Sequence, residues 1–317
     1  MTAPSTGPRL AIISNHLSTQ NKADGAWLLD IIAGHAWVRH YVIDQIADIP
    51  VILRDCATAG IETLAIDGGD GTAGLVFSGL LNDGPYTTLP ALALLPSGKT
   101  NMTAAAWSLT GDRREALAAL LVHCGEGTLP RTQHTQAILT LYHGSAPPKH
   151  GAFFGGADVV DGILYCRRKI YPLGWPNTLS HSAAVCLLLW RALKSGPQGG
   201  TVRVTTEDGG WSEDGRFFVV MATTMDKMLL GMRAHPSGGA GPMNYISLRP
   251  GAIPVLSTFA GLLRRRFKAT KHRTVRRTES VSFSFDGTYT LDGEIYETNT
   301  DTPIRLDSSQ TLTFVRW

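Results

Sequence analysis

The sequence has 317 residues, 43% of them hydrophobic, which is enough chain for one large domain or two smaller ones with buried cores. Its four cysteines lie far apart with no C-x-x-C pair, so they indicate neither a disulfide framework nor a zinc site, and a reducing cytoplasm fits best. No apolar run reaches the roughly 18 residues that span a bilayer, and the first residues lack the apolar core of a signal peptide. We therefore expect any membrane contact to be peripheral.

The formal net charge of +3 is unevenly spread along the chain. Residues 264–277, from Arg264 through Arg277, hold eight of the 29 Lys and Arg residues, and the rest of the chain carries 21 basic against 26 acidic residues. A dense basic segment on an otherwise acidic protein is typical of contact with phospholipid headgroups or nucleic acid. A solvated strand face or loop is an equally good interpretation.

The first 125 residues alternate short apolar runs with helical patterns. The runs predict strands at 10–14, 38–43, 63–66 and 91–95, and the patterns between and after them predict helices at 25–32, 46–56, 73–81 and 113–124. Such a repeat of strand and helix predicts a parallel sheet that is covered on both faces.

After about residue 135 the pattern changes to alternating strands separated by Gly and Asp-Gly turns, which is typical of antiparallel pairing. The expected strands include 135–142, 201–205, 217–222, 281–285 and 311–315, with an apolar helix at 179–193 and a turn at 197–200. The sequence therefore predicts an α/β domain over residues 1–134 and a β-rich antiparallel sandwich over residues 135–317. Whether the last strand returns to the interdomain region is left open.

A glycine-rich turn joins the third strand to the next helix through Gly68, Gly69, Asp70, Gly71 and Thr72. Glycines let the backbone approach phosphate oxygens, and a helix N-terminus offers unpaired N–H groups with a favourable dipole. Asp70 can cap this helix or hold Mg²⁺, and Thr72 can donate to a phosphate oxygen. On glycine content alone, a plain tight turn is an equally good interpretation.

A second turn follows the fourth strand and contains Gly98, Lys99, Thr100 and Asn101. Its Gly-Lys-Thr is similar to part of a Walker A loop, but position 93, where that loop needs its first glycine, is an alanine inside the strand. Lys99 can still reach an anion from this turn as a point charge.

These residues carry a resemblance to a known family. Residues 68–72 read GGDGT, the signature of the diacylglycerol kinase, sphingosine kinase, ceramide kinase and NAD kinase group, and residues 96–101 stand where that group has a P-x-G-T-x-N turn. Asp292, Gly293 and Glu294, followed by an expected closing strand, resemble the D-G-E motif of bacterial diacylglycerol kinases. This late motif favours the lipid kinases over the NAD kinases.

The resemblance implies that residues 1–134 form a nucleotide-binding domain and residues 135–317 a lipid-acceptor domain. It implies that ATP, with Mg²⁺ bridging its phosphates, binds in a cleft between the two. It implies that Glu294 accepts the proton of the lipid hydroxyl with Asp292 beside it and Asp70 as a third catalytic residue, although an isolated D-G-E hairpin is ordinarily a surface turn. The implied nucleotide-binding residues are Asn15, Gly68, Gly69, Asp70, Gly71, Thr72, Gly98, Lys99, Thr100 and Asn101.

The sequence also departs from the family pattern. His16 replaces a proline in the first turn, where residues 18–21 lack glycines, and Met102 replaces an aspartate after Asn101. The family segment that holds a structural magnesium in some members aligns with residues 241–245, which contain no carboxylate. We therefore expect no protein-bound structural metal there.

The sequence thus predicts an ATP-dependent lipid kinase in the cytoplasm, peripherally bound to the inner membrane face. The expected acceptor is diacylglycerol, or ceramide or another sphingoid lipid, and the expected membrane partner is anionic phospholipid at residues 264–277, with no nucleic acid. A catalytically inactive nucleotide- or lipid-binding member and, less favoured, an NAD kinase-like enzyme remain as alternatives. The methionine-rich residues 221–232 fit either an acyl-chain pocket or ordinary core.

Overall fold

The computed structural model describes residues 9–18, 20–21, 27–109, 111–165, 168–169, 201–207, 210–228, 231–251, 254, 257, 261, 264 and 266–316. The chain divides into two compact units, one formed by Met1–Gln136 with Thr311–Trp317 and the other by Ala137–Gln310. The predicted helix at 179–193 and turn at 197–200 lie outside the described residues. None of the helices in the described part of the chain is both long and apolar enough to cross a lipid bilayer.

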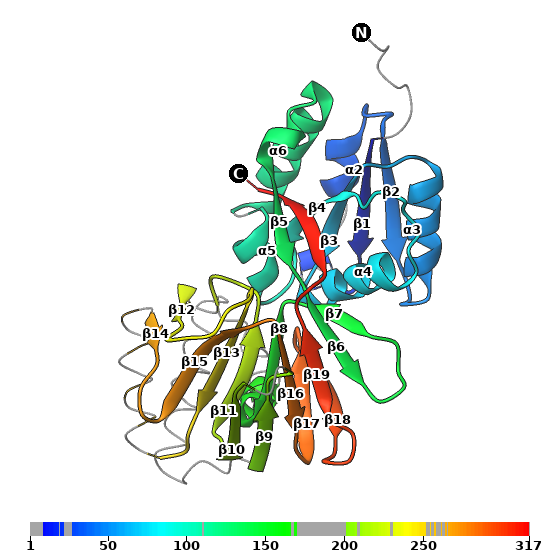
Figure 1. Ribbon diagram of the computed structural model, residues 1–317. Helices are drawn as coiled ribbons and strands as arrows, with labels where there is room; N and C mark the ends of the chain where they lie inside the picture. The colour runs from blue at the N-terminus through cyan, green and yellow to red at the C-terminus, as the bar shows by residue number, and fades with distance from the viewer. Residues whose placement is uncertain are drawn as a thin grey trace. The chain divides into compact units, whose positions relative to one another are not determined.

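A mostly parallel sheet forms the centre of the first unit (Figure 1). In order across the sheet its strands are β2 (Val38–Ile43), β1 (Leu10–Asn15), β3 (Thr63–Gly68), β4 (Ala91–Pro96), β20 (Thr311–Val315) and β5 (Gln133–Ala137). The pairs β1–β2, β1–β3, β3–β4 and β4–β20 are all parallel. The predicted α/β fold with a parallel sheet is confirmed, and its strands are continuous apolar runs because both faces are buried.

Helices cover both faces of this sheet. They are α2 (Trp27–Ile32), α3 (Asp48–Thr58), α4 (Asp70–Asn82), α5 (Met102–Trp107) and α6 (Arg113–Glu126), followed by the 3-10 helix η1 (Leu129–Thr132). Leu10 and Ile12 of β1 pack in one cluster with Trp27 of α2 and Leu117 of α6. On the opposite face, the ring of Phe314 in β20 lies 5.8 Å from Phe77 of α4 and 5.2 Å from Trp107 of α5. Alternate side chains of each strand thus serve opposite helical layers.

The chain passes between the two units twice. The first unit ends at Gln136, close to the boundary expected at residues 134 and 135, but Thr311–Trp317 belongs to it as well. The strand expected at 135–142 is two strands, β5 and β6 (Leu139–His143), which lie in different sheets, so the prediction of one strand is wrong. The break occurs at Ile138, whose N–H donates to the carbonyl of Gln310 at 2.8 Å and so joins the two passages of the chain.

Two six-stranded antiparallel sheets form most of the second unit, which confirms the predicted β-rich half. One contains β10 (Ser212–Arg216), β9 (Thr201–Thr205), β16 (Ser280–Ser284), β19 (Ile304–Asp307), β6 and β7 (Lys149–Gly151); the other contains β15 (Arg273–Thr278), β13 (Met243–Leu248), β11 (Val219–Thr223), β8 (Phe153–Ala157), β17 (Gly287–Leu291) and β18 (Glu294–Thr298). The helix α7 (Asp158–Tyr165) follows β8. Phe154 of one sheet stacks on Phe283 of the other at 4.7 Å, inside a core cluster that draws on both sheets.

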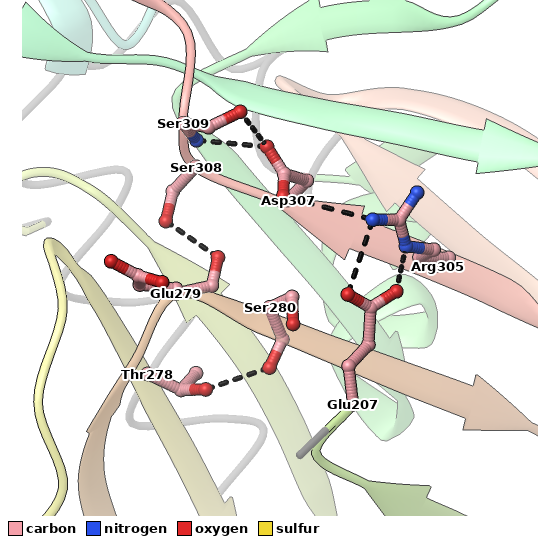
Figure 2. A network of polar contacts seen from close by, with 8 residues as sticks. All are labelled: Glu207, Thr278, Glu279, Ser280, Arg305, Asp307, Ser308 and Ser309. Carbon is pink, nitrogen blue, oxygen red and sulfur yellow. Dashed lines mark hydrogen bonds and ion pairs between the residues drawn. The ribbon is translucent and has the colours of Figure 1, made fainter.

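Polar side chains tie the end of β19 to its neighbours (Figure 2). The guanidinium of Arg305 forms an ion pair with Glu207, and the hydroxyl of Ser308 donates to the carbonyl of Glu279 at 2.7 Å. The carboxylate of Asp307 accepts the N–H of Ser309 at 2.8 Å. These bonds fix the chain immediately before it returns to the first unit at Thr311.

Candidate functional site

The Asp70 carboxylate joins the two glycine turns of the first unit. It accepts the backbone N–H of Met102 at 3.2 Å and of Thr103 at 2.9 Å, which are the first two residues of α5. Asp70 is itself the first residue of α4, and Gly69 stands at the N-cap of that helix. Asp70 therefore caps the neighbouring helix across the turns, where the sequence suggested a cap on its own helix.

The two turns also touch through their backbones. A Cβ atom added to Gly98 would lie 2.6 Å from the Cα of Gly69, closer than real side chains approach. Asn101 closes the second turn in the left-handed conformation, with φ of 51°, and its side-chain oxygen accepts the N–H of Gly98 at 2.7 Å. Its amide nitrogen donates to the carbonyls of Pro96 and Gly98. Glycine at 98 and asparagine at 101 are thus explained by close approach and by turn geometry.

The N-terminus of α4 has no side-chain cap. Its 13 residues align enough peptide dipoles to favour an anion at this end, and the N–H groups of the first turn have no partner within the helix. A small hollow lies at this end of the helix. It is lined by Ile66, Gly68, Gly69, Asp70, Ala73, Leu94, Leu95, Asn101, Thr103 and Ala104. Uncapped helix N-termini of this kind commonly bind anions such as phosphate.

The Thr72 hydroxyl is held by the end of β1. The side-chain nitrogen of Asn15 donates to Thr72 Oγ1 at 2.9 Å, while Asn15 Oδ1 accepts the N–H of Leu17 at 2.9 Å. A Cβ atom on Gly68 would lie 2.7 Å from the Thr72 Cβ, so glycine at 68 makes room for this threonine. Because Thr72 Oγ1 accepts from Asn15, its own hydrogen is the one that can donate to a ligand.

A buried carboxylate that sequence reasoning missed lies beneath these turns. Asp67 is 2% exposed and ends the apolar part of β3. It accepts hydrogen bonds from the hydroxyls of Ser14 and Ser97 and from the side-chain nitrogen of Asn21, at 2.9 Å for Asn21 and 3.2 Å for Ser14. Its oxygens therefore tie together the carboxyl ends of β1, β3 and β4, and these bonds offset the cost of burying a charge. The sequence signal was an aspartate ending the apolar run Leu64–Ile66.

Two cationic or titratable side chains complete this network. The guanidinium of Arg113 donates to Asn21 Oδ1 and to the carbonyl of Gln20, and it lies over the ring of Trp27 at 4.8 Å. The Nε2 of His40 lies 3.0 Å from the Ser14 hydroxyl. Burial lowers the pKa of His40 below its ordinary value, against the opposing charge of Asp67, which favours the neutral ring at neutral pH.

The remaining residues predicted in the first unit lie in the same two turns. Gly71, Lys99 and Thr100 are half-buried there. The structure thus gathers all ten predicted nucleotide-binding residues at the carboxyl ends of β1, β3 and β4, which is where parallel sheets commonly bind ligands.

The D-G-E motif forms a hairpin in the second unit. Asp292 and Gly293, with φ of 48° and 89°, are the two turn residues between β17 and β18, the conformation that favours Asp-Gly. The Asp292 carboxylate accepts the N–H of Phe153 at 2.9 Å and of Ala152 at 3.0 Å. A Cβ atom on Gly151 would lie 2.3 Å from Asp292 Oδ2. Asp292 therefore anchors the hairpin to the start of β8.

Glu294 is the first residue of β18, an edge strand, and its side chain is exposed. Tyr296 lies two residues further along the same strand. Burial raises the pKa of Tyr296, and the charges of Glu294 and Asp292 add to this effect. Asp292 and Glu294 thus share one hairpin of the second unit, while the other predicted residues lie in the first unit.

An arginine side chain bonds to the segment that the resemblance aligns with a metal-binding segment of the family. Arg277 donates from Nη1 to the carbonyls of Pro242 at 3.1 Å and Gly241 at 3.3 Å. Among the residues that the structure describes, no group of three or more His, Cys, Asp or Glu side chains is placed to hold a metal ion. The segment 241–245 is therefore held by a guanidinium.

The first unit is an α/β domain whose helix α4 begins at a glycine turn, and the second unit is built mainly from antiparallel sheets. Residues 9–127 match the family model of the diacylglycerol kinase catalytic domain. This match contains both glycine turns, and over residues 9–127 it agrees with the resemblance seen in the sequence.

Solved structures share the whole fold. A crystal structure assigned to a diacylglycerol kinase of Bacillus anthracis str. Sterne superimposes with a TM-score of 0.67 at 15% identity, covering 99% of this chain and 98% of that one. A second structure of a diacylglycerol kinase from the same organism gives a TM-score of 0.63 at 13% identity, with the same coverage. No curated protein matches the sequence significantly. At these identities the likeness establishes a common fold.

Proposed function

We propose that the protein is an ATP-dependent lipid kinase that transfers the γ-phosphoryl group to a hydroxyl of a membrane lipid. The observation that carries the proposal is the uncapped N-terminus of α4 beside the Gly98 turn, inside the segment that matches the diacylglycerol kinase catalytic domain. Phosphoryl transfer requires alignment and charge neutralisation more than covalent chemistry by the protein, so a rigid anion-binding turn is its main requirement.

The two turns have different roles in this proposal. The N–H groups of the first turn of α4 and the Thr72 hydroxyl donate to phosphate oxygens, and Lys99 adds positive charge nearby. The N–H of Gly98 is already donated to Asn101, so Gly98 contributes close approach of the backbone instead. Mg²⁺ bound with ATP supplies further neutralisation of the phosphate charge.

We assign Asp70 to holding the turns in register. Each of its two oxygens accepts an N–H from α5, so the carboxylate is committed to α5 before any ligand binds. A shift of about 1 Å in such a positioning contact is enough to cost about 10²-fold in rate. Asp70 is therefore a positioning residue in this proposal.

Glu294 is the proposed proton acceptor. The lipid hydroxyl oxygen attacks the γ-phosphorus, the bond from phosphorus to the β–γ bridging oxygen breaks, ADP leaves, and the hydroxyl proton passes to the Glu294 carboxylate. Its exposure on the edge strand β18 supports a role in contact with a second substrate, and Asp292 supports the hairpin by its bonds to β8.

The acceptor lipid is proposed as diacylglycerol, after the family, with ceramide or another sphingoid lipid as the competing choice. Radiolabelled ATP supplied with detergent micelles of each lipid in turn tests this. Label in the lipid extract for at least one lipid supports the lipid kinase function and names its acceptor. If no lipid is labelled, and NAD supplied in a parallel reaction is labelled instead, the lipid kinase function is overturned in favour of an NAD kinase-like enzyme.

A catalytically inactive nucleotide- or lipid-binding protein is the second candidate. It is favoured by the observation that both Asp70 and Asp292 bond to backbone N–H groups of the protein itself, and by Met102 at the position of the family aspartate. ATP consumption with and without lipid micelles separates the two functions, since a binding protein takes up ATP without lipid-dependent turnover.

A further inference from the structure

A small parallel ribbon in the second unit carries positive charge on one face. It consists of β12 (Arg233–His235) and β14 (Arg266–Lys268), with Arg233 opposite Arg266 and His235 opposite Lys268. The middle pair points the other way: Phe267 is 5% exposed and packs with Met228, Ile246 and Val275. Because side chains alternate along a strand, the flanking residues share the opposite, outer face. Arg233, Arg266 and Lys268 are exposed there, and His235 is half-exposed.

The surrounding sequence offers no acid to this face. From residue 227 to residue 278 there is no Asp or Glu, while the same stretch contains eleven Lys and Arg residues. Within the described part of the chain, Arg233, Arg266 and Lys268 form no ion pair. Like charges placed directly opposite on paired strands are destabilising, so this pairing costs stability unless an anion lies over it.

The basic segment 264–277 is divided by the fold into two parts. Arg273 is buried and donates from Nε to the carbonyl of Lys268, Arg276 lies over the ring of Trp211, and Arg277 donates to backbone carbonyls. These three arginines of β15 are committed to the structure. The charges of the segment that face solvent are therefore those of β14 together with Arg264 and Lys271, and β12 adds Arg233 from a separate stretch of sequence.

We propose that the outer face of the β12–β14 ribbon is a docking surface for anionic phospholipid headgroups. Phosphate diesters on a bilayer surface match a flat, two-stranded row of guanidinium and ammonium groups, and each Lys or Arg near an anionic membrane strengthens binding about fivefold at low salt. The choice of a bilayer over nucleic acid rests on the proposed lipid kinase function, because such an enzyme must meet its acceptor at a membrane.

Vesicle sedimentation without ATP tests the proposal on the full chain. The wild-type protein is expected to sediment with vesicles of 30% phosphatidylglycerol in phosphatidylcholine and to dissociate from them in high salt. With vesicles of pure phosphatidylcholine, the protein is expected to stay in the supernatant. The combined variant Arg233→Gln, Arg266→Gln and Lys268→Gln should bind about 100-fold more weakly at low salt. Binding of this variant within threefold of the wild type overturns the proposal.

Two matched variants separate charge at this place from charge in general. Arg54, Arg131 and Arg316 are exposed on the first unit, and changing all three to Gln removes the same net charge, so binding should fall less than threefold. Exchanging the ribbon residues as Arg233→Lys, Arg266→Lys and Lys268→Arg keeps the charge and should keep binding. A loss as large in the first-unit variant means that net charge alone is responsible and overturns the proposal.

Two further measurements give the remaining outcomes. Tighter binding of a duplex oligonucleotide than of the vesicles, lost in the ribbon variant, assigns the face to nucleic acid and overturns the proposal. Kinase activity on a soluble short-chain lipid should be unchanged in the ribbon variant. If the wild type lacks that activity while the ribbon variant loses vesicle binding, the kinase function fails and the membrane surface stands.

Discussion

The carboxylate of Asp70 lies 2.9 Å from the backbone nitrogen of Thr103, 33 positions later in the chain. Through this bond the residue that begins one helix caps the next one, and the two glycine turns become one rigid element. Asp112, on the same unit, is an ordinary cap that accepts the N–H of Arg114 and Glu115 at the start of its own helix α6. The pair offers a matched test of what Asp70 does.

Replacing Asp70 with Asn should reduce turnover by about 10²-fold or more, because one N–H of α5 loses its acceptor and the turns lose their register. Stability should fall by about 0.5–1.5 kcal/mol, the usual net contribution of one hydrogen bond. Asp112→Asn should keep nearly full stability in chemical denaturation, because one side-chain oxygen accepts both N–H groups there, and it should retain full turnover. Equal turnover in the two variants would show that Asp70 is an ordinary cap.

Replacing Gly98 with Ala should weaken ATP binding by at least about tenfold, because the new Cβ atom would lie 2.6 Å from the Gly69 Cα and force the turns apart. Gly125→Ala in α6 is the control, since its Cβ would meet no atom closer than 3.9 Å, and it should leave binding unchanged while stabilising the helix by up to about 1 kcal/mol. Calorimetric titration of both variants with ATP makes the comparison. Normal ATP affinity in Gly98→Ala would mean that the contact between the turns is not needed for the nucleotide.

Replacing Glu294 with Gln should lower kcat by about 10²- to 10⁴-fold, the usual effect of removing a general base. ATP affinity should hardly change, since the proposed phosphate site lies in the other unit. Glu297 is exposed on the same strand, and Glu297→Gln should behave as the wild type. Activity of Glu294→Gln within about threefold of the wild type would leave Glu294 a surface residue and require another proton acceptor.

Stability should fall at acid pH because of His150. Burial lowers the pKa of this histidine from about 6.5 to about 4, so the unfolded chain binds a proton at a higher pH than the folded one does. The folded state is therefore fully favoured above about pH 6.5 and loses up to roughly 3 kcal/mol as the pH falls to about 4. Urea unfolding at several pH values should show a shallower acid slope for His150→Gln than for the wild type. An unchanged slope would assign the acid sensitivity to other groups.

Much of the first unit could be predicted from the sequence because its features are local. Buried parallel strands are continuous apolar runs, and the glycine turns follow them directly, so β1 to β4 and the positions of the turns were predicted closely. What the turns do was harder to predict. The bonds of Asp67 to Ser14 and Ser97 join residues 53 and 30 positions apart, and the cap that Asp70 provides reaches α5, which the helical pattern did not reveal.

The second unit shows the same limit in its strands and charges. The apolar pattern of residues 135–142 is continuous, so nothing local marks the break at Ile138, which depends on its bond to Gln310. The basic segment was one feature in the sequence, but alternation along β14 and β15 separates exposed cations from those that bond to the protein. The contribution of Arg233 depends on the pairing of β12 with β14, which brings together residues 33 positions apart.

The place of β20 between β4 and β5 has a consequence for biosynthesis (Figure 1). A nascent chain that has emerged from the ribosome only as far as Gln310 contains both glycine turns but lacks a central strand of the sheet that carries them. Phe314, against which Phe77 of α4 and Trp107 of α5 pack, is also still missing at that stage. The sheet beneath the glycine turns is therefore completed only after the second unit has been translated, and a product that ends at Gln310 has a gap in the sheet that supports these turns.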